Sequence, residues 1–588
     1  MPMALLVLLL IGIIVVFVVT AYKEGKTNVS TTKRLYFYLL SFAALLVAAN
    51  GLILLLNFIL DRLSRQVIVS SAISEQLGLS LALLLVGSAL WVPHWAYIQR
   101  QVVKYPAETE SSLRKLYIYA FLFVSLVLTV ITLVQLLGWV LRNDNFTSSM
   151  VSGLIVWIPL WFYHWRLESK EGQPSPEARI LRHWYTYLTS FYSLAMVATG
   201  LGFVLFSILR SLYNGVFPVS VLAGEQTTLW TRGTRLALSI AIAGAPIWIY
   251  HWYRTARLNI ESTLRQVYLY LYAILLGALT ILTSLALSIY QILSWILGAS
   301  KATNAADHFR AFPAFIAPLI VGLALWVYHW NTVQKESGGL AFRLLSARRA
   351  YTYFMAALGL ATIAAGLIIL IPTLIDIVVP NARGVLVGAG WWRGRTGWIL
   401  TLLIIGIPWW SYFWLNVQRQ AIKGGPEERA ALTRRLHIYI VLVLSMLSVL
   451  GSLVFTIFSF LQPTFGGTLS SEVFRRAKWG IGVFVTASVI AYYYWLALRE
   501  DLAVGAEKIA RKASVTLIAG EEGKKLIPQL EEKLGYKLKI INTLEPENNI
   551  PSLTGEQLEV LARRIQDSKG AKVLVIVEDD GIKVVSYQ

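Results

Sequence analysis

The chain has 588 residues, of which 56% are hydrophobic and only 14% charged, and its formal net charge is +20. Soluble globular chains carry about 25% charged residues, so this composition excludes an ordinary soluble protein and predicts an integral membrane protein. The chain has no cysteine, which excludes disulfides, iron–sulfur and thiolate zinc sites, and a cysteine nucleophile.

The chain begins with an apolar run at residues 3–22 that carries no charge and has about the length of one membrane crossing. No basic residue precedes this run, whereas Lys23 and Lys26 follow it. That order of charges favours a retained transmembrane anchor at residues 1–30, with its N-terminus outside, over a cleaved signal peptide.

A two-helix pattern then recurs six times between Lys33 and Asp501. Each copy opens on a basic residue and a spaced Tyr-x-Tyr, runs through two apolar helices, and closes on an aromatic cluster of the type Trp-x-x-His-Trp. The openings start at Lys33, Arg114, Arg182, Arg265, Arg348 and Arg434; the last has His437 in place of the first tyrosine. The pattern predicts helical hairpins at 31–111, 112–178, 179–261, 262–345, 346–430 and 431–501, and about 13 transmembrane helices with the anchor.

Basic residues are unevenly distributed between the two ends of the hairpins. The first six loops at the ends where the repeats open and close hold 24 Lys and Arg, and the six loops inside the hairpins hold 14. Because basic loops stay in the cytoplasm, we expect a multi-pass protein of the cell (inner) membrane with its N-terminus outside and its C-terminus cytoplasmic.

The C-terminal part has a different character. Residues 502–512 are predicted to be a linker that continues the last helix, and residues 513–588 carry 10 basic and 12 acidic side chains. Strand and helix signals alternate there in the order β-α-β-α-β-β, which is typical of a small soluble α/β domain. The predicted core consists of Val515, Leu517, Leu538, Ile540, Leu574 and Ile576 on the strands and Leu526, Leu530, Leu558 and Leu561 on the helices.

The repeated order of Arg-x-x-Tyr-x-Tyr, an apolar hairpin and a closing Tyr-His-Trp resembles a bacterial membrane family catalogued as domain of unknown function 5671. The resemblance covers residues 31–500 in tandem units, and at two hairpins for each family unit it implies three units. It implies a multi-pass membrane protein. It brings no activity and no site residues, because the family has none assigned.

Four of the closing clusters contain a histidine that we expect at one common depth: His94, His164, His251 and His329. Neutral imidazoles in a membrane can ligate haem or the magnesium of a chlorin. The fifth and sixth repeats carry Phe413 and Tyr494 instead, which favours a structural role in an aromatic belt. We therefore expect no cofactor and no metal.

The openings offer a candidate lipid site. The basic residue and the first tyrosine stand three apart, so they share one face of a helix. A guanidinium beside a phenol at the membrane surface can bind a lipid phosphate, and the alternative is an anchor that fixes the depth of the helix. The candidate lipid-binding residues are Arg114, Tyr117, Arg182, Tyr185, Arg265, Tyr268, Arg348 and Tyr351.

No phosphate-binding loop, zinc-hydrolase motif or nucleophile elbow occurs in the sequence, and the predicted membrane centres hold no ionisable residue. These features predict a non-enzymatic membrane scaffold, or a protein that interacts with lipids and partners. We expect anionic headgroups as lipid partners, a protein partner at the C-terminal domain, and no nucleic acid. The alternatives are a transporter or channel, and a haem- or pigment-binding protein that uses the closing histidines.

Overall fold

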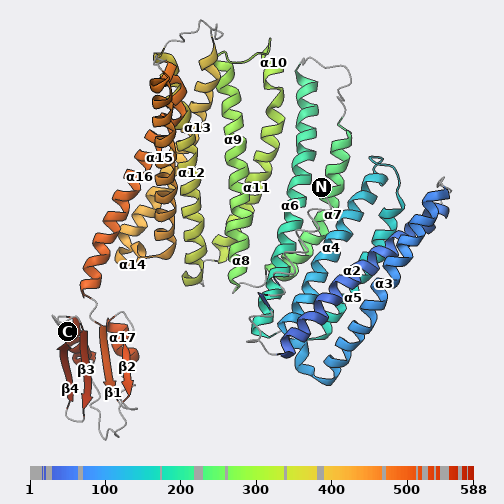
Figure 1. Cartoon of the computed structure of the whole chain (residues 1–588). Helices are drawn as coiled ribbons and strands as arrows, with labels where there is room; N and C mark the ends of the chain where they lie inside the picture. The colour runs from blue at the N-terminus through green and yellow to red at the C-terminus, as the bar shows by residue number, and fades with distance from the viewer. Residues whose placement is uncertain are drawn as a thin grey trace. The chain divides into compact units, whose positions relative to one another are not determined.

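The computed structural model describes a helical array followed by a small sheet (Figure 1). The described residues are 16, 19–20, 29–63, 70–172, 175–217, 229–257, 262–336, 341–379, 390–466, 472–511, 514–519, 527–534, 538–542, 555–566, 572–578 and 581–587. The chain divides into two compact units, residues 1–351 and 352–588. Each unit is described by itself.

The first unit contains the first four hairpins, each a pair of long helices packed side by side. The pairs are α2 (Val29–Leu63) with α3 (Ser70–Lys104), α4 (Ser112–Val140) with α5 (Ser148–Lys170), α6 (Pro176–Val216) with α7 (Arg232–His251), and α9 (Leu275–Ile296) with α11 (Phe312–Glu336). Short helical turns η1 (Pro106–Glu110), α8 (Thr263–Val267), α10 (Ala305–His308) and η4 (Phe309–Ala311) lie between them. Two π-helical segments interrupt the regular helices: η2 (Trp252–Ala256) extends α7, and η3 (Tyr268–Ile274) joins α8 to α9.

Local sequence signals explain where α6 and α7 begin. Pro176 is the first residue of α6, a position at which proline costs no hydrogen bond. The hydroxyl of Ser175 accepts a hydrogen bond from the backbone N–H of Ala178, and Thr231 caps α7 in the same way through Thr234. Both caps satisfy N–H groups that a helix leaves without partners at its first turn.

The second unit contains the fifth and sixth hairpins. Helix α12 (Ala341–Val378) begins ahead of the unit boundary and is followed by α13 (Trp391–Lys423), the short α14 (Gly425–Arg429), α15 (Leu432–Phe465) and α16 (Glu472–Arg511). One buried cluster joins α12, α13, α15 and α16 through residues such as Ala356, Val417, Val441 and Ala497. Helix α16 includes most of residues 502–512, the segment that was predicted to continue the last helix.

Eleven helical segments in the described parts of the chain are long and apolar enough to cross a membrane. They comprise all the hairpin helices except α5, which has 23 residues and is not among the eleven. The predicted anchor at residues 3–22 lies outside the described residues except for Val16, Val19 and Thr20. The twelve hairpin helices predicted from the repeats are therefore all present as helices.

Glycines let the two helices of a hairpin approach closely. In the fourth hairpin a Cβ atom placed on Gly277 would lie 2.9 Å from the backbone oxygen of Gly322. A Cβ atom on Gly322 would lie 3.0 Å from the oxygen of Gly277. Such reciprocal contact between small residues is the usual basis of tight helix packing where lipid tails offer no hydrophobic driving force.

The C-terminal domain has a four-stranded sheet of order β2-β1-β3-β4. Its elements are β1 (Ser514–Ala519), α17 (Ile527–Leu534), β2 (Lys539–Asn542), α18 (Gly555–Gln566), β3 (Lys572–Glu578) and β4 (Gly581–Tyr587). Strand β1 pairs in parallel with β2 and β3, while β3 and β4 form an antiparallel hairpin. The chain order is therefore the predicted β-α-β-α-β-β.

The predicted core of this domain is correct for β1 and wrong for β3. Val515 and Leu517 are buried as predicted, but on β3 the buried residues are Val573 and Val575, not Leu574 and Ile576. In the parallel pairing Val573 lies beside Val515 and Val575 beside Leu517, so these four share the face that the helices cover.

The outer strand gives the second correction. Leu538 is buried as predicted, but Ile540 on β2 is 42% exposed, because β2 is an edge strand. Leu530, Leu558 and Leu561 pack on the sheet as expected from the two helices. Leu526 lies outside the described residues.

Candidate functional site

The histidine of a closing cluster pairs with the first tyrosine of the same hairpin. The distances between the histidine Nε2 and the tyrosine oxygen are 3.5 Å for His94 and Tyr36, 3.4 Å for His164 and Tyr117, and 3.2 Å for His251 and Tyr185. His164 is fully buried and Tyr117 is too. The pairs therefore connect the two helices of each hairpin at the end where the repeat opens and closes.

A second hydrogen bond fixes the tautomer of each histidine. Nδ1 lies 2.7–2.9 Å from the carbonyl oxygen four residues earlier in all four closing histidines. A carbonyl oxygen only accepts, so Nδ1 carries the proton and Nε2 of the neutral ring is the acceptor. The tyrosine hydroxyl consequently donates to Nε2 in the first three hairpins.

The sixth hairpin contains the same pair with the two residues exchanged. His437 stands at the opening position and Tyr494 at the closing position, and Nε2 of His437 lies 3.4 Å from the hydroxyl of Tyr494. The rings of the exchanged pair are 5.7 Å apart, the same spacing as Tyr117 and His164. An exchange that keeps the contact shows that the contact between phenol and imidazole, and not the position of the histidine, is the common feature.

Beside this pair, every second hairpin buries the basic residue of its opening. The guanidinium of Arg114 lies 5.9 Å from the ring centre of Trp95, and the same distance separates Arg265 from Trp252 and Arg434 from Trp414. All three arginines are at most 2% exposed. In each case the tryptophan is the last residue of the preceding closing cluster, so one hairpin supplies the indole and the next supplies the cation.

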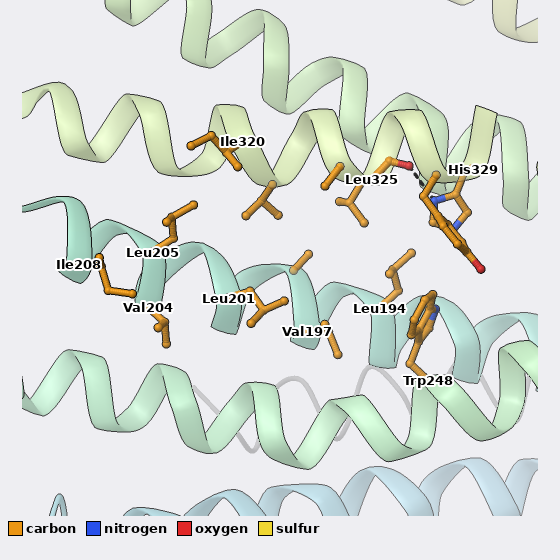
Figure 2. A pocket seen from close by; sticks show the side chains of 14 residues that line it. Leu194, Val197, Leu201, Val204, Leu205, Ile208, Trp248, Ile320, Leu325 and His329 are labelled. Atoms are coloured by element: carbon orange, nitrogen blue, oxygen red, sulfur yellow. Dashed lines mark hydrogen bonds between the residues drawn. The ribbon is translucent and has the colours of Figure 1, made fainter. Parts of the chain in front are cut away.

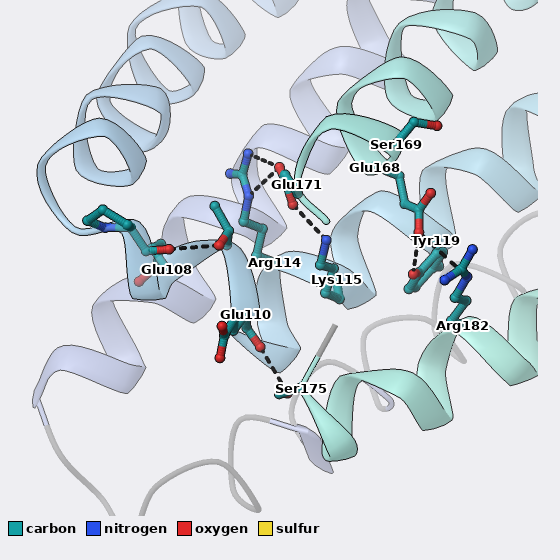
Figure 3. Close-up of polar contacts among 12 residues, drawn as sticks. Glu108, Glu110, Arg114, Lys115, Tyr119, Glu168, Ser169, Glu171, Ser175 and Arg182 are labelled. Carbon is teal, nitrogen blue, oxygen red and sulfur yellow. Dashed lines mark hydrogen bonds and ion pairs between the residues drawn. The ribbon is translucent and has the colours of Figure 1, made fainter. Parts of the chain in front are cut away.

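An acidic residue neutralises two of these arginines. Glu171 accepts from Nε and Nη2 of Arg114 at 2.8 and 2.5 Å and from Lys115 at 2.9 Å, as Figure 3 shows. Asp501 accepts from Nε and Nη2 of Arg434 at 2.5 and 3.0 Å. A buried charge is tolerated only when it is paired and hydrogen-bonded in this way.

A glutamine four residues after the tryptophan completes these two sites. Oε1 of Gln99 lies 3.5 Å from Nη2 of Arg114, and Oε1 of Gln418 lies 2.9 Å from Nη2 of Arg434. At the corresponding position of the third site stands Ala256, and Arg265 donates from Nε to the backbone oxygen of Ala256 at 3.1 Å. Ala256 ends the π-helical segment η2, a distortion that frees carbonyl oxygens from the regular ladder.

The candidate lipid-binding residues thus fall into two groups. Arg114 and Arg265 are buried, as are Tyr117 and Tyr268, and the Arg114 guanidinium forms an ion pair with Glu171. Arg182 is 39% exposed at its side chain and lies 3.7 Å from Glu168, which also accepts from Tyr119 (Figure 3).

The other members of that candidate set lie at the openings of odd hairpins. Tyr185 pairs with His251, and Arg348 is exposed. Tyr351 is 3% exposed and packs against the rings of Tyr270 and Trp330. Lipid binding at any of these residues stays a prediction.

The four closing histidines are not brought together as a cluster, since each contacts the tyrosine of its own hairpin. Within the described residues no group of three or more His, Asp or Glu side chains is placed to hold a metal ion. Haem or pigment binding by His94, His164, His251 and His329 also stays a prediction.

Sequence reasoning missed the acidic partners, although the sequence contains a signal for them. Glu171 and Asp501 each stand seven residues after the closing His164 or Tyr494, and Glu336 stands seven after His329. The same position holds Gln101, Leu258 and Gln420 in the odd hairpins. The acid, like the buried arginine, thus recurs every second hairpin and marks a two-hairpin unit.

The comparison with protein families is consistent with tandem units. The model of the family described as a domain of unknown function (DUF5671) matches the chain at residues 34–148, 143–216, 187–314 and 349–493. The chain belongs to this family. The matches form four segments, of which the first three overlap, and not the three separate units that the resemblance implied. No curated protein and no solved structure matches the chain.

Proposed function

We propose that this member of the family is a multi-pass membrane scaffold that performs no catalysis and presents its C-terminal domain to a protein partner in the cytoplasm. Support for the membrane location comes from the outward-facing side chains of the long helices. Leu85, Leu450 and Val454 are each more than 60% exposed although strongly apolar. Soluble monomers rarely expose such surfaces, whereas lipid tails cover them at no cost.

The observation that carries the scaffold role is the mutual pairing of the motif residues. Arg114 and Glu171, Arg434 and Asp501, and the tyrosine–histidine pairs all contact one another between helices. Groups that neutralise each other in this way hold helices in place. These pairs explain why the motif residues recur, and the explanation needs no substrate.

The orientation follows from the distribution of basic residues in the loops, 24 against 14. A reporter enzyme that is active only in the periplasm, fused after Gln588, should be silent, and the same reporter in a loop inside a hairpin should be active. The two fusions are measured in the same strain with equal expression. The reverse pattern of activities would contradict the orientation.

Support for a partner of the C-terminal domain comes from the face of the sheet opposite the helices. Ile518, Leu574 and Ile576 lie on this face and are half-buried, and Ile541 and Val585 on the same face are 46% and 39% exposed. Parallel strands such as β1, β2 and β3 are normally covered on both faces of their sheet. We therefore assign this face, the open sheet face, to a protein partner.

Exposed lysines on the open sheet face indicate the charge that the partner's surface should carry. Lys539 and Lys583 lie on the open sheet face beside the apolar residues. A complementary surface would be apolar at its centre and acidic at its rim, because such complementarity guides association.

Photo-crosslinking in cells tests this assignment on the full chain. A photoreactive amino acid at Val585 should give a discrete adduct, because that side chain lies on the open sheet face. The matched control is Val560 on α18, which is 52% exposed but on the other side of the domain. Equal adducts from both positions, or none from Val585, would contradict the assignment.

A further inference from the structure

The second tyrosine of each opening contacts the hairpin that follows along the chain. Its ring centre lies 5.2–5.9 Å from that of the first aromatic residue in the next opening. The pairs are Tyr38 with Tyr117, Tyr119 with Tyr185, Tyr187 with Tyr268, Tyr270 with Tyr351, and Tyr353 with His437. Each pair lies inside one of the two units. One aromatic contact, the ring pair, therefore recurs wherever one hairpin follows another.

The rings at the two ends of this series are exposed. The tyrosines of the five ring pairs other than Tyr185 are at most 5% exposed. By contrast, Tyr36 of the first hairpin is 55% exposed and Tyr439 of the sixth is 48% exposed. In the described parts of the chain, Tyr36 has ring contacts only to its own hairpin and Tyr439 has none. The sixth hairpin thus offers the second tyrosine of a ring pair, and the first hairpin offers its partner.

The helices follow a rule of their own at these junctions. The opening helix of one hairpin packs against the closing helix of the next, as α2 does with α5, α4 with α7 and α6 with α11. Figure 2 shows α6 and α11 side by side, with Leu201 and Ile320 extending into the apolar gap between them. The exposed opening helix at the end of the series is α15, and the exposed closing helix at its beginning is α3.

Both of these helices expose the face that such a junction uses. The α3 residues at positions where α11 faces α6, counted from the closing histidine, include Leu85, Val86 and Leu90, which are 66%, 58% and 40% exposed. The α15 residues at positions where α6 faces α11, counted from the first aromatic residue of the opening, include Met446 and Leu450, which are 54% and 62% exposed. Lipid tails would cover apolar faces as well, so the ring pair and the order of the hairpins decide the occupant.

The order of the hairpins fits a further junction. The buried arginine recurs every second hairpin, so six hairpins make three complete two-hairpin units. The sixth hairpin ends one unit and the first begins another. A first hairpin placed after a sixth therefore forms the same kind of junction as the second hairpin forms with the third. There Tyr119 stacks on Tyr185 with the ring centres 5.8 Å apart.

We infer that the sixth hairpin binds the first hairpin of a second copy of this chain. Tyr439 and Trp495 of one copy contact the ring of Tyr36 of the next. They do so as Tyr270 and Trp330 contact Tyr351 within one chain. Helix α15 lies against α3 of the second copy. Because the contact joins two different surfaces, each copy keeps one end for a further copy, and the copies form a closed ring or an open row.

Cysteine crosslinking in cells tests the contact, because the chain has no cysteine of its own. Two copies with different tags are expressed together, one with Tyr36→Cys and the other with Tyr439→Cys, and treated with a short membrane-permeable bis-maleimide. We expect an adduct of twice the mass of the chain that carries both tags. In the matched control Tyr412→Cys replaces Tyr439→Cys, because Tyr412 is 69% exposed and stands in the closing cluster of the fifth hairpin, off the proposed contact.

Placing both cysteines in one chain distinguishes a second copy from the first hairpin of the same chain. Contact between copies gives products of two or more times the mass of one chain, and contact within a chain gives a linked product of one mass. A linked product of one mass alone would overturn the inference, and so would a two-tag adduct no stronger than the Tyr412→Cys control. A stronger adduct between two copies that both carry Tyr439→Cys would overturn it too.

Tyr439→Ala tests the ring pair without disturbing the fold, because Tyr439 lies half exposed at the end of the series. Self-association is followed by energy transfer between labelled full-length copies in proteoliposomes as lipid is added. We expect an association constant lower by about threefold to tenfold, the factor that one aromatic pair contributes. Tyr412→Ala is the control and should leave the association constant unchanged. Equal association constants for the two variants would contradict the inference.

The inference extends the proposed scaffold role, and the two fail separately. Extraction of cell membranes at alkaline pH tests the membrane location alone, because an integral protein stays in the pellet. If the protein stays in the pellet and no two-tag adduct forms, the contact between copies is wrong and the scaffold proposal stands. If the adduct forms and the protein leaves the pellet, the contact stands and the membrane location is wrong.

Discussion

Replacing Asp501 by alanine should lower the free energy of unfolding by about 3–5 kcal/mol, because the change leaves the Arg434 guanidinium buried without its counter-charge. Arg434 is 1% exposed and donates two hydrogen bonds to Asp501, at 2.5 and 3.0 Å. The measurement is denaturant unfolding of the detergent-solubilised protein. The neighbouring Glu500 provides a matched control, since its side chain is 64% exposed and contacts Arg429 at 3.0 Å. Glu500→Ala should cost less than about 1 kcal/mol, as exposed ion pairs usually do.

Removing both charges distinguishes the cost in stability of an unpaired buried charge from the cost of the lost packing contact. In the double variant Arg434→Met, Asp501→Leu we expect most of the lost stability to return, because apolar residues of similar size replace buried ion pairs with little penalty. Equal effects of Asp501→Ala and Glu500→Ala would refute the structural role of the buried pair. A double variant as unstable as Asp501→Ala would show that the loss comes from packing instead.

Exchanging Tyr117 and His164 should leave the protein close to its original stability, within about 1 kcal/mol, although both residues are fully buried. The sixth hairpin already uses the exchanged order, with His437 at the opening and Tyr494 at the closing position. By contrast, His164→Phe leaves the Tyr117 hydroxyl without an acceptor and should cost about 1–3 kcal/mol. Thermal denaturation of the three proteins in one detergent gives the comparison.

The control for this experiment is His94→Phe, because its partner Tyr36 is 55% exposed and can find another acceptor in its surroundings. That variant should change the stability by only a few tenths of a kcal/mol. If the exchanged protein is as unstable as His164→Phe, the pair is not interchangeable, and the histidine has a role of its own at this position.

Sequence and structure agree most closely where a signal is periodic and local. The hairpins follow from apolar runs of bilayer length between fixed opening and closing residues, and all twelve predicted helices are present. The order of elements in the C-terminal domain was likewise predictable from alternating strand and helix signals. Which face of β3 is buried was not predictable, because Lys572–Glu578 is apolar on both faces. Only the pairing of β3 with β1 decides that Val573 and Val575 point to the helices.

By itself, the sequence determined the repeat, the apolar character of the helices and the position of every motif residue in its hairpin. Only the tertiary structure decided which residues meet. It places Arg114 of the second hairpin on Trp95 of the first and pairs that guanidinium with Glu171, because the packing of helices against one another brings these residues together. It also shows that Nε2 of His329 lacks the hydrogen bond that Nε2 of His164 makes, although both stand in the same motif.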